Sequence, residues 1–132
     1  MKKVTGIGGI FFKSKDPEKI KEWYRKHLGI ESDQYGATFE WGRADAPGPS
    51  GYTVWSVMPE NTKYFDPSPS PFMVNYRVEN LDTLLEELRE AGVEVDDKVE
   101  EYEYGKFGWI MDPEGRRIEL WEPKDEKFKE IL

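Results

Sequence analysis

The side chains that could do chemistry in this sequence are carboxylates and cations. There is no cysteine, which excludes disulfides, cysteine-ligated zinc and thiol catalysis. The one histidine, His27, lies at the end of a predicted helix, where we interpret it as a surface residue. A single histidine without cysteine leaves little room for a Ser–His or Cys–His pair. Carboxylates therefore remain as candidate general bases, with lysine and arginine as cations that could stabilise negative charge.

A weak internal repeat indicates how these side chains are positioned. At an offset of 64 residues, Gly51 meets Gly115, Pro59 meets Pro123, and the predicted strands between them coincide. Glycine and proline fix backbone geometry, so their coincidence indicates two copies of one module. The 132 residues are enough for one domain. We divide it into module one at about 4–59, a Pro-rich linker at about 60–70, module two at about 71–123 and a tail at 124–132.

Periodicity predicts similar elements in both halves. Asp16-Pro17 begins a helix that Gly29 ends, and Asn80 begins a second helix that is followed by Gly92. Apolar alternation and turn residues predict strands at 6–13, 37–41, 52–57, 72–78, 93–95, 107–111 and 116–121. Each half is thus expected to be β-α-β-β-β, in the α+β class. Residues 102–108 are either a loop over a cavity or an edge strand followed by a turn, and the tail either docks as a helix or frays.

Several motifs carry a specific resemblance. The sequence Asp-Pro-Glu-Gly-Arg-Arg-Ile-Glu-Leu at 112–120 resembles the closing hairpin of the glyoxalase / bleomycin-resistance / extradiol-dioxygenase superfamily, also called vicinal oxygen chelate proteins. Trp23-Tyr24 followed by Leu28-Gly29 resembles the helix of that family's first module, and residues 80–93 resemble the helix of its second. The resemblance implies two tandem βαβββ modules, related by pseudo-twofold symmetry, whose curved mixed sheet encloses a cavity. It also implies a homodimer.

The same resemblance locates four positions at which family members usually hold a divalent metal. The first ligand position lies seven residues before Asp16, at Gly9, and the 64-residue offset gives Met73. Glu119 is the last position, and the offset superposes Trp55 on it. Glycine has no donor side chain, indole does not coordinate, and thioether sulfur is a soft ligand. One carboxylate cannot hold a catalytic cation, so we expect no metal and no cofactor.

Strand parity extends these positions to a ligand-binding surface, because residues i and i+2 share a face. If Gly9 faces the cavity, it leaves room for a ligand. The side chains expected to bind that ligand are Phe11, Lys13, Trp55, Met73, Asn75, Arg77, Trp109 and Trp121. Mostly apolar walls with a few polar groups are typical of a small-molecule pocket. The alternative is a filled, inert cavity in which Glu119 only pairs with a cation.

Three functions fit these expectations. The first is a metal-independent small-molecule-binding protein, whose ligand is aromatic or anionic. The second is a glyoxalase-like lyase, isomerase or epimerase with Glu119 as general base, and the third is a degenerate module kept for protein association. The net charge of −8 argues against binding of nucleic acid. The absence of a membrane-length apolar run, a leader and cysteine favours a cytoplasmic protein without a membrane partner.

Overall fold

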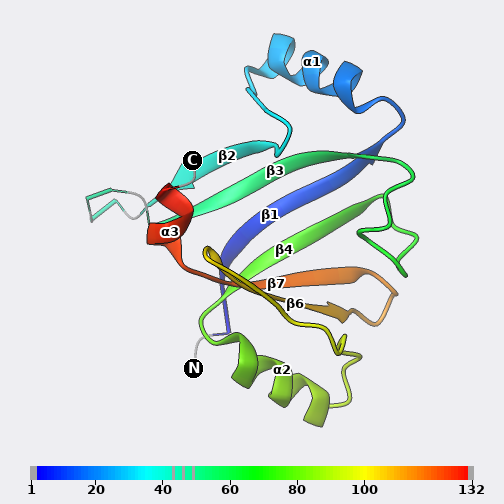
Figure 1. Cartoon of the computed structure of the whole chain (residues 1–132), viewed down its shortest axis with the longest axis vertical. Helices are drawn as coiled ribbons and strands as arrows, with labels where there is room; N and C mark the ends of the chain where they lie inside the picture. The colour runs from blue at the N-terminus through cyan, green and yellow to red at the C-terminus, as the bar shows by residue number, and fades with distance from the viewer. Residues whose placement is uncertain (1–2, 43, 46, 49, 131–132) are drawn as a thin grey trace.

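The computed structural model describes residues 3–42, 44–45, 47–48 and 50–130. Within these residues, seven strands form one open mixed sheet in the order β2-β3-β1-β4-β7-β6-β5 (Figure 1). The α+β fold expected from the sequence is therefore confirmed. The elements are β1 (Val4–Ser14), α1 (Pro17–Leu28), β2 (Ala37–Trp41), β3 (Gly51–Pro59), β4 (Phe72–Val78), α2 (Leu81–Glu90), β5 (Glu100–Tyr102), β6 (Gly105–Met111), β7 (Arg117–Pro123) and α3 (Asp125–Glu130).

The two halves repeat one pairing pattern. β1 and β4 are antiparallel neighbours at the centre, and each pairs in parallel with the last strand of its own half, β3 or β7. That last strand pairs antiparallel with the strand before it, β2 or β6. In the described residues the second half has the predicted β-α-β-β-β order, whereas the first half has one strand fewer.

The largest departure within the second half concerns its short strands. The predicted strand at 93–95 is reduced to one bridge between Val95 and Ile110. Strand β5 lies further along, and a two-residue turn joins it to β6. Residues 102–108 thus adopt the edge strand and turn that formed one of the two alternatives.

Local sequence accounts for both long helices. The Asp16 side chain accepts a hydrogen bond of 3.2 Å from the Lys19 N–H, and Asn80 accepts one of 3.2 Å from Thr83 N–H. Both caps satisfy a backbone donor that the helix leaves unpaired. Gly29 follows α1 with a φ of 70°, a left-handed conformation that favours glycine. The predicted helix boundaries are confirmed.

The two faces of the sheet have different covers. Helix α2 packs on the outer face, where alternate residues of β4 and β7 form a core with its leucines. The members of this core include Val78, Leu81, Leu84, Leu85 and Leu120. The inner face is covered by the segment 60–71, which we call the linker, and by α3, through Phe65 and Phe128. The tail thus docks as a helix, and residues 131–132 lie outside the described residues.

Between the two long helices, the outer face is uncovered. Helices α1 and α2 lie at opposite ends of the molecule, and β1 and β4 cross the space between them (Figure 1). Val4, Ile7, Ile10 and Phe72 form an exposed apolar strip there, which we call the outer strip. Ile10 is 43 % exposed, because α1 stands at one end of the sheet and does not cover it. Among the described residues, no helix is long and apolar enough to cross a membrane.

Candidate ligand-binding site

Polar side chains meet on the inner face of β4 and β7. The parallel register places Asn75 beside Glu119, and Met73 and Arg77 share the face of Asn75. Strand β6 adds Trp109, which is the cross-strand partner of Glu119. All five side chains are buried. Of the residues that strand parity grouped, these five are therefore neighbours in the structure.

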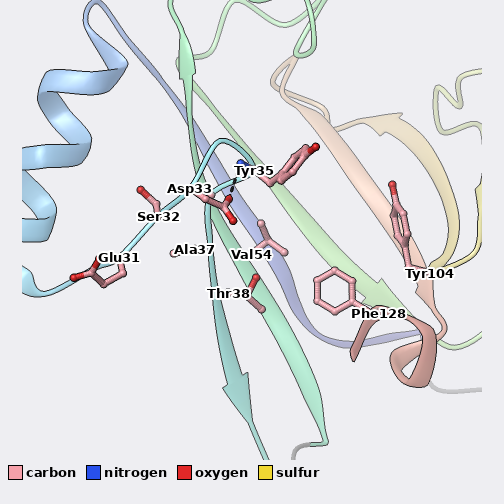
Figure 2. Close-up of a pocket in the computed structure, with 10 residues that line it drawn as sticks. Glu31, Ser32, Asp33, Tyr35, Ala37, Thr38, Val54, Tyr104 and Phe128 are labelled. Carbon is pink, nitrogen blue, oxygen red and sulfur yellow. Dashed lines mark hydrogen bonds between the residues drawn. The ribbon is translucent and has the colours of Figure 1, made fainter. Parts of the chain in front are cut away.

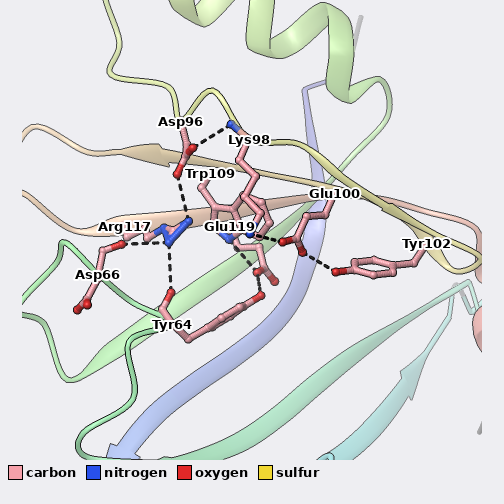
Figure 3. A network of polar contacts seen from close by, with 9 residues as sticks. All are labelled: Tyr64, Asp66, Asp96, Lys98, Glu100, Tyr102, Trp109, Arg117 and Glu119. Atoms are coloured by element: carbon pink, nitrogen blue, oxygen red, sulfur yellow. Dashed lines mark hydrogen bonds and ion pairs between the residues drawn. The ribbon is translucent and has the colours of Figure 1, made fainter.

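Glu119 is only 2 % exposed and accepts three hydrogen bonds, of which Figure 3 shows those from Tyr64 and Trp109. The Asn75 Nδ2 donates to Oε1 over 2.6 Å, and the Trp109 indole Nε1 donates to Oε2 over 3.0 Å. The hydroxyl of Tyr64, from the linker, also donates to Oε2. Within the described part of the chain, no lysine or arginine forms an ion pair with this carboxylate. Neutral donors from three separate segments therefore hold Glu119.

Burial is the main influence on the pKa values of Glu119 and Tyr64. It raises the pKa of Glu119 above its ordinary value, and the hydrogen bonds from Tyr64, Asn75 and Trp109 oppose the shift. Burial and the charge of Glu119 also raise the pKa of Tyr64, so the phenol keeps its proton and donates it. The expected alternative in which Glu119 only pairs with a cation does not match these contacts, because its three partners are neutral donors.

The linker closes the centre of the inner face. Phe65 is fully buried and packs with Phe11, Met73 and Trp109. Arg117 holds the linker backbone, because its Nη1 donates to the carbonyl oxygens of Tyr64 at 3.2 Å and Asp66 at 3.1 Å (Figure 3). Its guanidinium also lies over the Trp109 ring, 5.0 Å from the centroid. The space next to Glu119, where the sequence predicted a ligand cavity, is therefore filled by the protein's own side chains.

One of the four metal positions inferred from the family was placed on the wrong face. Gly9 pairs with Val54, 45 residues further on, whereas Val74 pairs with Ile118, 44 residues further on. One sequence offset therefore cannot align both strand pairs, and a slip of one residue moves a side chain to the other face. Ser56, not Trp55, is the counterpart of Glu119.

The side chains at the four positions where family members usually hold a metal do not fit a divalent cation. Glu119 already accepts three hydrogen bonds, Ser56 is a weak neutral donor, and Met73 offers only a thioether. At Gly9, an added Cβ would lie 2.7 Å from the Phe11 ring, so Phe11 fills the room that we expected a ligand to use. Among the described residues, no group of three or more His, Cys, Asp or Glu side chains could hold a metal.

Trp55 packs on the outer face against Phe12 and Tyr24, with ring centroids 5.4 and 5.0 Å away, which corrects its predicted position on the cavity face.

The cations expected at the ligand-binding surface, Lys13 and Arg77, lie away from Glu119. The ammonium of Lys13 lies 5.4 Å from the centroid of Phe65, at the edge of the filled centre. Arg77 forms an ion pair of 2.5 Å with Asp125 of α3. Its guanidinium carbon lies 5.2 Å from the ring centroid of Trp41 and 5.2 Å from that of Trp121.

An open cavity of about 840 Å³ lies elsewhere on the inner face, between the two halves (Figure 2). Its walls come from the segment 31–38, from Val54 of β3, from Tyr104 in the β5–β6 turn and from Phe128 of α3. Figure 2 shows Tyr104 and Phe128 across from Asp33 and Thr38. The lining combines aromatic rings with hydroxyl groups and carboxylates, which suits a small organic ligand.

Sequence reasoning missed much of this lining. None of the cavity residues was among the predicted ligand-binding side chains. Val54 was missed because its neighbour Trp55 was assigned to the cavity face, and strand parity does not reach the residues in loops and turns. Tyr64 and Phe65 were assigned to a linker without further function. Their signal was present: two adjacent aromatic residues in a Pro-rich segment have apolar surface to bury, which a purely solvated linker does not.

Comparison with known proteins identifies the fold. The family model "Glyoxalase/Bleomycin resistance protein/Dioxygenase superfamily" matches residues 6–120. A search of curated proteins found no match.

Solved structures with this fold are similar over most of the chain. Methylmalonyl-CoA epimerase from Mycobacterium tuberculosis is 23 % identical, with a TM-score of 0.60 over 96 % of this chain and 93 % of that one. A variant of Streptomyces coelicolor methylmalonyl-CoA epimerase, in complex with 2-nitronate-propionyl-CoA, has a TM-score of 0.65 at 16 % identity, over 92 % and 99 % of the two chains. A superfamily member from Vibrio splendidus 12B01 has a TM-score of 0.56 at 13 % identity, over 88 % and 97 %. Identities this low support the fold and leave the chemistry to the site itself.

Proposed function

We propose a function for this chain, which belongs to the glyoxalase/bleomycin resistance protein/dioxygenase superfamily. It is a metal-independent small-molecule-binding protein. The observation that carries the proposal is the cavity of about 840 Å³ on the inner face. A volume of this size matches pockets for small organic ligands, which are typically about 300–1,000 Å³. Val54, Tyr104 and Phe128 offer apolar contact, and Ser32 and Thr38 offer hydroxyl groups.

The chemistry of the donors supports metal independence. A catalytic zinc needs about three protein ligands, and magnesium or manganese needs an oxygen-rich shell. The inherited positions supply one carboxylate, whose oxygens are already hydrogen-bonded. A ligand would therefore be held by the cavity wall itself.

A pocket-filling substitution tests the proposal. Thr38 and Val54 are cross-strand partners that both line the cavity, so Thr38→Trp places an indole inside it. The control is Phe39→Trp, one residue along the same edge strand and exposed. A library of small aromatic molecules is screened by thermal shift after treatment with a chelator. We expect ligands that stabilise the wild type and Phe39→Trp but not Thr38→Trp. Equal stabilisation of all three proteins would refute this cavity as the site.

A second function is favoured by the state of Glu119. A buried carboxylate with a raised pKa can act as a general base, as in a lyase, isomerase or epimerase. Two of the similar structures are described as methylmalonyl-CoA epimerases. In this alternative Glu119 removes a proton from a carbon next to a carbonyl, after Tyr64 and the linker move aside. Lys13 or Arg77 would then stabilise the negative charge that develops on the substrate.

Deuterium exchange distinguishes this alternative from simple binding. Small carbonyl acids are incubated with the protein in D₂O, and loss of the proton on the α-carbon is followed by NMR. The enzyme hypothesis requires exchange by the wild type that Glu119→Gln abolishes. Binding without exchange supports the first function.

The remaining expectations concern assembly and location. We propose that the protein is a homodimer and that it is located in the cytoplasm. We propose no nucleic acid partner, because the net charge of −8 disfavours contact with phosphates. The outer strip offers an apolar surface on which a second copy could pack.

A further inference from the structure

Arg77 is a buried cation whose hydrogen-bonding capacity is only partly used. The side chain is 4 % exposed, and only its Nη2 has an acceptor, the Oδ2 of Asp125. In the described part of the chain, the Arg77 Nε and Nη1 have no hydrogen-bond partner, and neither does the Asp125 Oδ1. A guanidinium typically binds a carboxylate through two parallel bonds. This pair has one, although each partner has a second atom to offer.

The shape of the surroundings indicates what would complete the bond. The ring centroids of Trp41 and Trp121 both lie 5.2 Å from the guanidinium carbon, and a carboxylate binds the N–H groups along the edge of the guanidinium plane. Asp125 approaches from helix α3, and three residues further along the helix Phe128 packs against Trp121 and Tyr52. One face of α3 thus presents a carboxylate and a phenyl ring to the inner face. Phe128 is also a wall of the cavity.

Few interactions hold helix α3 in place. It has six residues, and Phe128 is its only buried side chain. The other attachments are the Asp125 ion pair and a hydrogen bond of 3.0 Å from the Lys124 N–H to the Tyr104 carbonyl. A helix this short is not stable alone, and segments with few buried contacts open at low free energy. Displacement of α3 would remove a cavity wall and uncover Arg77 in the same movement.

We propose that α3 is a tethered substitute for the ligand, in which Asp125 occupies a carboxylate subsite and Phe128 an aromatic subsite. The ligand is then an aromatic carboxylate that binds with its ring beside Trp121 and its carboxylate on the edge of Arg77. A free carboxylate is not held by a helix backbone and can form both parallel hydrogen bonds, so it competes with Asp125. This inference rests on the function proposed above and specifies its ligand class.

Charge is consistent with this orientation. Glu31 and Asp33 are exposed on the wall that lies across from Phe128, so a carboxylate is favoured at the Arg77 end and disfavoured at theirs. The net charge of −8 opposes an anion at long range, but salt screens charges beyond about 8 Å. The local cation therefore decides.

The test uses two matched probes, 2-naphthoate and its neutral amide, 2-naphthamide, titrated against tryptophan fluorescence. Asp125→Asn removes the competing charge while it leaves Phe128 and Arg77 in place. Glu126→Gln is the control, since it makes the same charge change at the next, exposed position of the helix. In the double variant Asp125→Asn/Arg77→Gln neither charge is present, so no unpaired charge is buried.

We expect Asp125→Asn to increase the affinity for naphthoate relative to naphthamide by about fivefold or more. Glu126→Gln should leave this ratio unchanged, and the double variant should lose the gain. If both probes bind and the ratio is the same in all proteins, the carboxylate subsite is refuted while the proposed function stands. If neither probe, nor any compound of the thermal-shift library, binds any of the proteins, the proposed function fails and this inference fails with it.

Discussion

Glu119, at one of the four positions where the family resemblance implies a metal ligand, is a buried residue of the core. Its oxygens accept hydrogen bonds from a strand, a neighbouring indole and the linker. The donors are neutral, so they stabilise the carboxylate without an ion pair and leave its pKa raised by burial. A residue in this state contributes to stability first, and it can contribute to chemistry only after the linker opens.

The first prediction concerns the stability that these hydrogen bonds provide. Glu119→Ala leaves the buried donors of Asn75 and Trp109 and the partly exposed Tyr64 hydroxyl without this acceptor, and we expect it to lower the free energy of unfolding by about 3 kcal/mol. Glu119→Gln keeps one carbonyl oxygen and the side-chain volume, so about 1 kcal/mol is expected. Urea unfolding of the three proteins measures both values. If Glu119→Ala unfolds at the same urea concentration as the wild type, the network is not formed in solution.

The second prediction concerns the pH dependence of stability. The pKa of Glu119 is raised in the folded state, so the folded protein binds this proton more tightly than the unfolded chain does. Its contribution is fully present below about pH 4.3, the ordinary pKa of glutamate, and it is lost as the pH rises through the folded value. The difference in unfolding free energy between wild type and Glu119→Gln should therefore fall as the pH rises above about 4.3.

The comparison with Glu119→Gln isolates this carboxyl from the others. Asp112 and Glu100 have lowered pKa values, because of hydrogen bonds from Arg116 and Lys98, and their contributions are lost as the pH falls. They are present in both proteins and cancel in the difference. A difference that grows with pH would mean that Glu119 is stabilised as an anion.

At the scale of elements, the linker packs over the inner face of the sheet, and Arg117 hydrogen-bonds to its backbone. Arg117 donates to two linker carbonyl oxygens, lies over Trp109 and pairs with Asp96 at 3.4 Å. The linker in turn places Tyr64 on Glu119 and Phe65 in the core. Access to Glu119 thus depends on Arg117.

The third prediction concerns a variant that lacks the hydrogen bonds from Arg117 to the linker. Arg117→Met keeps an apolar chain over Trp109 but removes the hydrogen bonds to the linker, so the linker should open more often. We expect hydrogen exchange at the amides of Asp66 and Ser68 to accelerate roughly tenfold, which corresponds to about 1.4 kcal/mol. Arg116→Met is the control, because Arg116 is exposed and pairs with Asp112 and Glu114 in the same hairpin. Equal exchange in both variants would contradict the role given to Arg117.

Some elements could be predicted from sequence because their causes are local. Asp16 and Asn80 cap helices through side chains that reach backbone donors three residues away, and turn residues delimit the strands. Parity also put Asn75 on the face of Met73, since alternation within one strand needs no other information. These features depend on neighbours that a sequence displays directly.

Other features depend on contacts between distant segments. The position of Trp55 failed because the spacing between paired strands differs by one residue between the halves, which sequence similarity this weak does not reveal. The contacts of Tyr64 with Glu119 and of Asp125 with Arg77 join residues 55 and 48 positions apart. Neither contact has a local signal. The cavity likewise depends on where the β5–β6 turn and α3 fold back.

For the whole molecule, the separation of α1 from α2 leaves the outer strip without a partner. The fourth prediction is that a second copy of the chain covers this strip. Ile10→Asp places a charge at a position that is 43 % exposed, and it should shift the mass measured by light scattering from dimer toward monomer. Val99→Asp is the control, at 42 % exposure and outside the strip. A monomer mass for the wild type at high concentration, or equal shifts in both variants, would contradict the assignment.

The measurement that most directly tests the central claim is calorimetric titration of the protein with the best thermal-shift ligand, before and after treatment with a chelator. A cavity wall that binds by itself predicts one ligand per chain, with the same affinity in both preparations. The affinity should be lost in Thr38→Trp and kept in Phe39→Trp. Binding that appears only after a divalent metal is restored, and that Glu119→Ala abolishes, would show that the inherited metal position is functional and would contradict the claim.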